Sequence, residues 1–399
     1  MTQPAFKQAA VVTPRFSAAE MERRYALTRD LMAEHELDAL VVFGNSGVNR
    51  HNHANHFWLS QWQDMHHCYL VVPRGGEPTL LVGLVNHVPN AREISDVPKI
   101  DWGGYEPGKT IASLVSGRVG LVGVNATWND GMPWRHYEDL RASGAELRDV
   151  TREFAALRRI KSAEEIERLR GAAELSDLAV RTLVDVAKPG VSETELVALV
   201  EESYRRRGGT TRITFLRSMP MNEPNGCLPA QNPSARELER GDVIITEISA
   251  SLWGYSGQVH RPVFVGADPT SEWQRMFDVA REAYEAIAQG MAPGSTEGDV
   301  IRNASVIGGA GYAIYDDLIH GYGTDYGPPL VDRSCVRYWT GGGDPPPGRT
   351  IEQGMTIVIQ PNPITPDERM GLQLGALTVV TDRGAESLHT LPFEPLVAA

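Results

Sequence analysis

The segment RRIKSAEEIERLRGAAELSDLAVRTLVDVAKPG, residues 158–190, decides how the chain is divided. Ser162 and Glu165 form a capping box within it, in which each side chain can satisfy a backbone N–H group at the start of a helix. The helix is predicted to run to about Ala187, because Pro189-Gly190 cannot continue it. A long helix at this point indicates a boundary, so we predict domains over residues 1–155 and 156–399.

Upstream of this segment, strands alternate with helices. A capping box at Ser17 and Glu20 opens a helix that reaches about Glu36. The apolar run LDALVVFGN follows, and its continuous apolar character is typical of a buried, parallel strand. CYLVVPRGGEPTLLVG predicts two strands around an Arg-Gly-Gly turn, and GRVGLVGV predicts another buried strand. Such alternation favours an α/β domain.

Downstream, helices and strands fall into separate blocks. A helix opens at Ser192 and closes at the Arg205–Arg207 run, a long helix covers about 271–290, and a short one lies near 297–310. The remaining segments are strands of antiparallel type. Separate blocks of this kind favour an α+β domain.

The composition excludes several classes of partner. A net charge of −13 disfavours nucleic acid and anionic membrane surfaces. No apolar run approaches the ~20 residues that span a bilayer, and the first residues lack the pattern of a secretory signal. The three cysteines, Cys68, Cys227 and Cys335, are far apart and odd in number. Reduced thiols of this kind are typical of a cytoplasmic protein.

An ordered set of phrases resembles the creatinase/aminopeptidase P/prolidase family. The phrases are Ile160-Lys-Ser-Ala-Glu-Glu-Ile166, Glu239-Arg-Gly-Asp-Val243, Trp253-Gly-Tyr255, His320-Gly-Tyr-Gly323, Glu352-Gln-Gly-Met355 and Val379-Val-Thr-Asp-Arg-Gly384. The resemblance implies an α/β N-terminal domain followed by an α+β "pita-bread" catalytic domain. It also implies a small-molecule substrate and a homodimer in which the N-terminal domain of the partner closes the site.

The family's metallopeptidases hold two divalent ions with two aspartates, one histidine and two glutamates. By the resemblance, the corresponding positions here hold Glu247, Gln258, His320, Gln360 and either Gly375 or Gln373. Neutral amides cannot neutralise or bridge two divalent ions. We therefore predict no metal ligands and no cofactor, and we leave open a single ion on Glu247, His320 and His260.

The metal-free branch of the family is represented by creatinase, and its site residues have also changed. The branch's His-Asn-Pro phrase becomes Gln231-Asn-Pro233. The glutamate before an arginine becomes His260 before Arg261, and the second glutamate becomes Gln360. Because both guanidinium-binding carboxylates are lost, creatine is excluded as a substrate.

We predict that His260 and His320 are the catalytic acid and base, since imidazole titrates near neutral pH. Glu247 would orient an imidazole or hold a substrate N–H group, and amide side chains would polarise a carbonyl. The predicted substrate-binding residues of the catalytic domain are Gln231, Tyr255, Gln258, Arg261, Asp325 and Gln360.

The N-terminal domain carries a second candidate region, in which five histidines alternate with aromatic and amide side chains. These histidines are His51, His53, His56, His66 and His67. The pattern suits either a metal site or the wall of a small-molecule pocket. By the resemblance, His66 takes the position of an arginine that holds a substrate carboxylate, so we predict substrate contacts for His66 and Trp62.

Together these residues predict a metal-independent hydrolase for a C–N bond in a small amide, lactam or amidine. Three alternatives stay open. The same histidines could serve a lyase or isomerase, the protein could bind a small molecule without turnover, or it could be an Xaa-Pro-type metallopeptidase with altered ligands.

Overall fold

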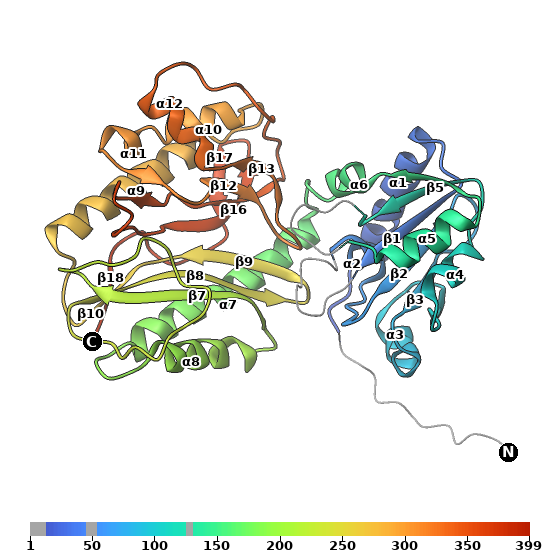
Figure 1. Ribbon diagram of the computed structural model, residues 1–399, viewed down its shortest axis with the longest axis horizontal. Coiled ribbons are helices and arrows are strands. Elements are labelled where there is room, and N and C mark those ends of the chain that lie inside the picture. Colours follow the sequence, from blue (N-terminus) through green and yellow to red (C-terminus); the bar gives the residue numbers. More distant parts are fainter. Residues whose placement is uncertain (1–12, 45–53, 125–130) are drawn as a thin grey trace. The chain divides into compact units, whose positions relative to one another are not determined.

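The first part of the chain forms a sheet of short strands that alternate with helices (Figure 1). The computed structural model describes residues 13–44, 54–124 and 131–399, and its contacts divide the chain into a first unit, 1–158, and a second unit, 159–399. Within the described part of the first unit, six strands pair in the order β4-β3-β2-β1-β5-β6. They are β1 (Ala39–Gly44), β2 (Cys68–Pro73), β3 (Thr79–Val82), β4 (Lys99–Trp102), β5 (Arg118–Val122) and β6 (Glu146–Asp149).

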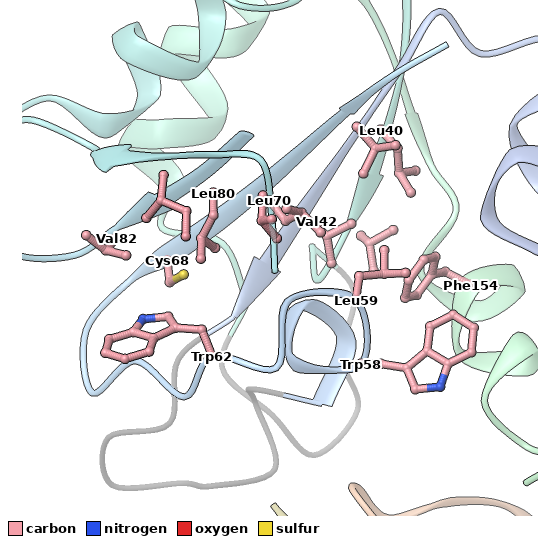
Figure 2. Close-up of a cluster of buried hydrophobic side chains, with 14 of the residues drawn as sticks. Leu40, Val42, Trp58, Leu59, Trp62, Cys68, Leu70, Leu80, Val82 and Phe154 are labelled. Carbon is pink, nitrogen blue, oxygen red and sulfur yellow. The ribbon is translucent and has the colours of Figure 1, made fainter. Parts of the chain in front are cut away.

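Both faces of this sheet are covered, because successive residues of β1 enter two different hydrophobic cores. Leu40 and Val42 belong to the core that Figure 2 shows, and Val41 and Phe43 belong to the core on the opposite face. Burial on both faces explains the continuous apolar sequence of the strand. The helices of the unit are α1 (Ala18–Glu34), α2 (Ala54–Ser60), α3 (Val88–Ile94), α4 (Pro107–Ala112), α5 (Trp134–Ala142) and α6 (Thr151–Leu157).

The pairing of β1 refines the prediction of a parallel strand. β1 runs parallel to β5 and antiparallel to β2. The antiparallel partner arises because β2 and β3 form the hairpin predicted around Arg74-Gly-Gly76. The first unit is therefore a mixed α/β sheet, and its α/β class is confirmed.

The second unit opens with the predicted capping box. The Glu165 N–H donates to Ser162 Oγ at 3.2 Å, and the Ser162 N–H donates to Glu165 Oε2 at 3.0 Å. These bonds start α7 (Ala163–Val186), which ends one residue before the predicted Ala187. The other helices are α8 (Glu193–Arg205), α9 (Ser271–Gly290), α10 (Glu297–Asn303), α11 (Val306–Gly309) and α12 (Val336–Thr340).

One large, mostly antiparallel sheet organises the second unit. Its order is β13-β12-β14-β16-β9-β8-β10-β18, with β7 beside β8 and β17 beside β16. Figure 1 shows α7 and α8 along β7–β9, and α9–α11 beside the strands that follow. The strands are β7 (Thr210–Pro220), β8 (Asp242–Leu252), β9 (Tyr255–His260), β10 (Val263–Val265), β12 (Ile319–Gly321), β13 (Gly327–Val331), β14 (Thr356–Ile359), β16 (Gly375–Thr381), β17 (Gly384–Ser387) and β18 (Leu396–Ala398). A separate pair consists of β11 (Ala313–Ile314) and β15 (Pro363–Ile364).

This arrangement confirms the predicted α+β class of the second unit, with helices and antiparallel strands in separate blocks. The short helix predicted near 297–310 is divided into α10 and α11. Within the described residues, no helix combines the length and the apolar character that crossing a bilayer requires.

Candidate active site

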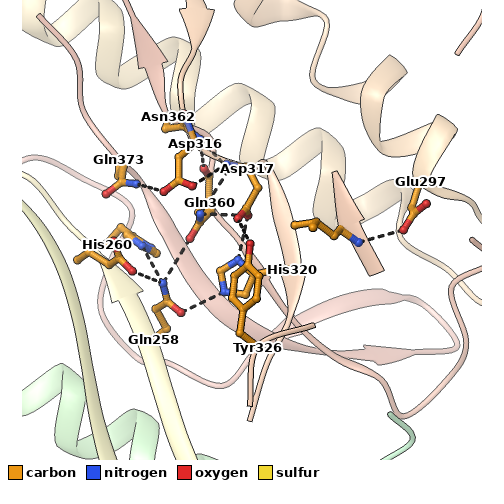
Figure 3. A network of polar contacts seen from close by, with 12 residues as sticks. Gln258, His260, Glu297, Asp316, Asp317, His320, Tyr326, Gln360, Asn362 and Gln373 are labelled. Atoms are coloured by element: carbon orange, nitrogen blue, oxygen red, sulfur yellow. Dashed lines mark hydrogen bonds and ion pairs between the residues drawn. The ribbon is translucent and has the colours of Figure 1, made fainter. Parts of the chain in front are cut away.

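Gln258, on the central strand β9, is the hub of a buried polar cluster (Figure 3). Its amide nitrogen donates to Glu247 Oε1 on β8 at 2.9 Å and lies 3.3 Å from His260 Nε2. Its amide oxygen lies 3.1 Å from Nε2 of His320 on β12. Because alternate residues of a strand share a face, Gln258 and His260 point to the same side of the sheet. One amide thus joins side chains from three strands.

His320 is held through both ring nitrogens. Its Nε2 faces Gln258, and its Nδ1 lies 2.9 Å from Asp317 Oδ1. The Asp317 carboxylate also accepts hydrogen bonds from the Tyr326 hydroxyl at 2.6 Å and from the Gln360 amide at 3.1 Å. A carboxylate behind an imidazole fixes the orientation of the ring.

A second carboxylate, Asp316, lies beside Asp317 in the turn before β12. Its Oδ2 accepts a hydrogen bond from Gln373 Nε2 at 3.0 Å. Asn362 clamps this turn, because its side-chain oxygen accepts from the Asp316 N–H at 3.0 Å and its nitrogen donates to the Asp317 carbonyl at 2.7 Å. Figure 3 shows both carboxylates directed toward the amides of Gln360 and Gln373.

Burial shifts the proton affinity of three groups in the cluster. Removal from water, reinforced by Asp316 and Asp317, raises the pKa of Glu247 to about 8. Burial, together with the charge of Asp317, raises the pKa of Asp316 to about 6. Burial lowers the pKa of His260 well below its ordinary value. At neutral pH the Glu247 carboxyl therefore keeps its proton, and the His260 imidazole is neutral.

Gly375 occupies one of the two positions where the resemblance places the family's last glutamate, the other being Gln373, and no side chain fits at Gly375. A Cβ at this position would lie 2.4 Å from the Ile359 carbonyl oxygen and 2.9 Å from His260 Nδ1. The main chain and the ring of His260 together fill the space that a glutamate would need.

Gly375→Ala is therefore expected to lower the free energy of unfolding by about 2 kcal/mol, because the Ile359 carbonyl belongs to a paired strand and cannot move aside. Urea unfolding followed by circular dichroism measures the change. Gly309→Ala is the matched control, since a Cβ there would meet no atom within 4 Å. Equal stabilities of the two variants would contradict the prediction.

Two further predicted substrate residues of the second unit are fully buried. The Arg261 guanidinium donates to main-chain carbonyls, among them that of Gly375 at 2.7 Å, and lies over the ring of Phe393. The Tyr255 hydroxyl donates to Glu165 Oε1 at 2.9 Å and so ties β9 to the start of α7. Through these bonds, Arg261 and Tyr255 connect neighbouring elements of the second unit.

The last two predicted substrate residues of this unit are more exposed. Asp325 is partly exposed, and its Oδ1 accepts a hydrogen bond from the Thr324 hydroxyl at 3.4 Å. Gln231 is exposed in the connection between β7 and β8. Their roles toward a substrate stay predictions.

The histidine-rich region belongs to the first unit. Trp62 is 6% exposed and packs in the core of Figure 2, whereas the His66 side chain is 42% exposed. His56 is fully buried in α2, and burial lowers its pKa to about 4, as expected for a core histidine. His51 and His53 lie outside the described residues. Substrate contacts of Trp62 and His66 stay predictions.

The structure adds residues that the sequence interpretation did not select. Asp316, Asp317, Tyr326 and Asn362 all bond within the cluster, and Gln373 had been considered only as an alternative ligand position. An available signal was the adjacent pair Asp316-Asp317 three residues ahead of His320. Neither aspartate lies in a phrase that carries the family's ligands, so the resemblance did not point to this pair.

Family models match both parts of the chain. The model described as "Metallopeptidase family M24" matches residues 167–382, and the model described as "Creatinase/Prolidase N-terminal domain" matches residues 24–160.

Similar proteins include two named Xaa-Pro dipeptidase. That of Lactobacillus helveticus is 24% identical over 75% of this chain and 82% of its own length. That of Pyrococcus furiosus is 23% identical over 84% of this chain and 90% of its own length. Among solved structures, the prolidase from Pyrococcus horikoshii OT3 matches with a TM-score of 0.75 at 20% identity, over 93% of this chain and 99% of that chain. This likeness supports the same fold.

These findings contradict the prediction of a metal-independent hydrolase with a histidine acid/base mechanism. The matched family is one of metallopeptidases, and the named relatives are Xaa-Pro dipeptidases. The prediction was wrong because it inferred the reaction from the changed ligand positions alone, whereas the relatives are peptidases. Folding brings Asp316 and Asp317 into the same cluster, where alignment of the ligand positions could not place them.

The residues present do not fit the pair of ions that this family implies. The amide nitrogens of Gln258 and Gln360 are directed into the cluster as donors, and Gly375 offers no ligand atom. Within the described residues, no three ligand atoms of His, Cys, Asp or Glu converge around this cluster as closely as a shared ion needs. Two hard cations bridged by carboxylates therefore have no matching set of oxygens here.

Proposed function

The chain belongs to metallopeptidase family M24, and on this premise we propose that it is a hydrolase of small Xaa-Pro-type peptides with an altered active site. One observation carries the proposal: Glu247, Asp316, Asp317 and His320 converge on one buried cluster of the pita-bread sheet. The Xaa-Pro dipeptidases among the relatives support the substrate class.

The proton affinities of the cluster suit hydrolysis of a C–N bond. The pKa of Glu247, raised to about 8, and that of Asp316, raised to about 6, both lie close to neutral pH. Groups that titrate near the working pH exchange protons most effectively with reacting atoms. We propose that the carboxyls of Glu247 and Asp316 exchange protons with the scissile peptide bond. Asp317 would hold the imidazole of His320 beside that bond.

A panel of Xaa-Pro dipeptides, with matched Xaa-Ala dipeptides, tests this function. The purified chain is assayed after treatment with chelator and again with added manganese or cobalt, so that the metal requirement is measured separately from the substrate class. We expect turnover of Xaa-Pro substrates, and we expect Asp316→Asn to lower kcat/KM by at least about 100-fold.

The control is Asp344→Asn, a change of an exposed aspartate in the second unit. It is expected to leave kcat/KM unchanged. The absence of turnover with every dipeptide, with and without added cations, would reject the proposal.

A second candidate, a peptide-binding protein without turnover, is favoured by the amide network itself. Gln258 and Gln360 bond to their neighbours where the family has ionised ligands. Thermal stabilisation by Xaa-Pro dipeptides in a chain that shows no hydrolysis would support this function.

We further propose that the protein is a homodimer in which the partner's N-terminal domain closes the site, as the family resemblance implies. Light scattering coupled to size-exclusion chromatography measures the mass, and a monomer at micromolar concentration would exclude this arrangement.

A further inference from the structure

Three potential metal ligands of the first unit, none of them a member of the cluster around Gln258, lie close to one another. Asp64 and His66 lie in the connection between α2 and β2, and His87 ends the short 3-10 turn Val85–His87 before α3. One ligand atom from each of the three lies within 4.8 Å of the others. Two imidazoles and one carboxylate form a donor set that suits first-row divalent cations such as zinc.

Asp64 is fixed as a ligand would be. Its carboxylate is fully buried, and Oδ2 accepts hydrogen bonds from Trp62 Nε1 at 3.0 Å and from the Gly83 N–H at 2.9 Å. The other oxygen, Oδ1, accepts from the His66 N–H at 2.9 Å. Such bonds from surrounding groups orient the carboxylates that bind metals in proteins.

His66 supplies the second observation. Its Nδ1 lies 3.8 Å from Asp64 Oδ1, too far for a hydrogen bond, and this nitrogen is buried without a hydrogen-bond partner among the described residues. The rings of His66 and His87 are tilted at 47°, with centroids 6.2 Å apart, so they do not stack on one another. This nitrogen and the fixed carboxylate beside it are both placed to contact one ion.

The space around these side chains is kept open by Gly83. A Cβ at this position would lie 2.5 Å from His66 Cβ and 3.2 Å from Asp64 Oδ1. Ligands of a tetrahedral zinc ion lie about 3.3 Å apart, since each bond is about 2.0–2.1 Å long. The three ligand atoms here lie within 4.8 Å of one another, so they would approach by up to about 1.5 Å when an ion binds.

We propose that Asp64, His66 and His87 bind one first-row divalent cation of the zinc type in the first unit. Three protein ligands leave a fourth position for water or for an oxygen or nitrogen of another molecule. None of its residues belongs to the cluster around Gln258, so zinc binding can be measured separately from peptidase activity.

Calorimetric titration of the untagged, chelator-treated full chain with zinc alone tests this site. We expect one equivalent bound to the first unit, with an affinity at least about 100-fold weaker in His66→Gln and in His87→Gln. Replacing zinc with cobalt supplies an independent readout, a visible absorption band that both variants should lose.

Two controls separate this site from other changes. His35→Gln alters a partly buried histidine at the end of α1 and should bind zinc as the unchanged chain does. His320→Gln alters the cluster of the second unit and should keep the equivalent assigned to the first unit. Circular dichroism of each variant verifies its fold before titration.

Equal zinc affinity and stoichiometry in the unchanged chain and in the His66→Gln/His87→Gln double variant would overturn the proposal. An unchanged chain that binds no zinc more tightly than about 100 µM, an affinity near 5.5 kcal/mol, would overturn it as well.

Discussion

Gln258→Leu is expected to lower the free energy of unfolding by about 3 kcal/mol. The leucine has a similar volume but makes none of the bonds of the amide, which joins Glu247 Oε1 to Nε2 of His320. His320 would stay buried and the partly exposed Glu247 would lose its donor, and each unsatisfied buried polar group costs about 1–3 kcal/mol. The large effect follows from the position of Gln258 between three strands of the sheet.

Urea unfolding of Gln258→Leu, compared with the unchanged chain, measures this loss. Gln353→Leu is the matched control, because Gln353 is exposed in the turn before β14 and should change stability by less than about 0.5 kcal/mol. A loss of unfolding free energy below about 1 kcal/mol for Gln258→Leu would contradict the prediction. It would show that water replaces the amide and that the hydrogen bonds of Gln258 contribute little to stability.

Glu247→Gln is expected to make stability less dependent on pH. The pKa of Glu247 is raised to about 8 from an ordinary value of 4.5, so the folded chain holds this proton more tightly than the unfolded chain does. The stabilisation of the folded chain that comes from this proton is fully present below about pH 4.5 and is lost as pH rises through 8. The glutamine carries no titrating proton and still offers an oxygen to the Gln258 amide.

The two chains should therefore be similar in stability at pH 5 and differ at pH 8. One pKa unit corresponds to about 1.4 kcal/mol, and partial exposure of Glu247 reduces the full value, so we expect the variant to be about 2 kcal/mol more stable at pH 8. Urea unfolding at pH 5, 6.5 and 8 measures the slopes. Glu352→Gln, at an exposed position, is the control. Parallel slopes for Glu247→Gln and the unchanged chain would refute the raised pKa.

Most of the cluster could be predicted from the sequence. Glu247, Gln258, His260, His320 and Gln360 were selected from aligned phrases, and the structure brings them together around one amide. Their grouping was predictable because phrases of the family keep their order and spacing along the strands.

The chemistry of the cluster could not be predicted in this way. Asp316 and Asp317 are adjacent acidic residues in a turn, and an adjacent acidic pair is most often a solvated surface feature. Only the folded chain shows that Gln373, Gln360 and Asn362 enclose this turn.

The sequence by itself determined most helices and strands, and with them the α/β class of the first unit and the α+β class of the second. Capping boxes and strand periodicity act within a few residues, so they can be recognised without the tertiary structure. Ser162 and Glu165 start α7 through bonds three residues apart, whatever lies elsewhere in the chain. The tertiary structure alone decided the environment of each polar group. Burial and neighbouring charges raise the pKa of Glu247, and packing of Ile359 and His260 excludes a side chain at Gly375. Desolvation and close packing depend on residues far apart in the sequence, so no local pattern records them.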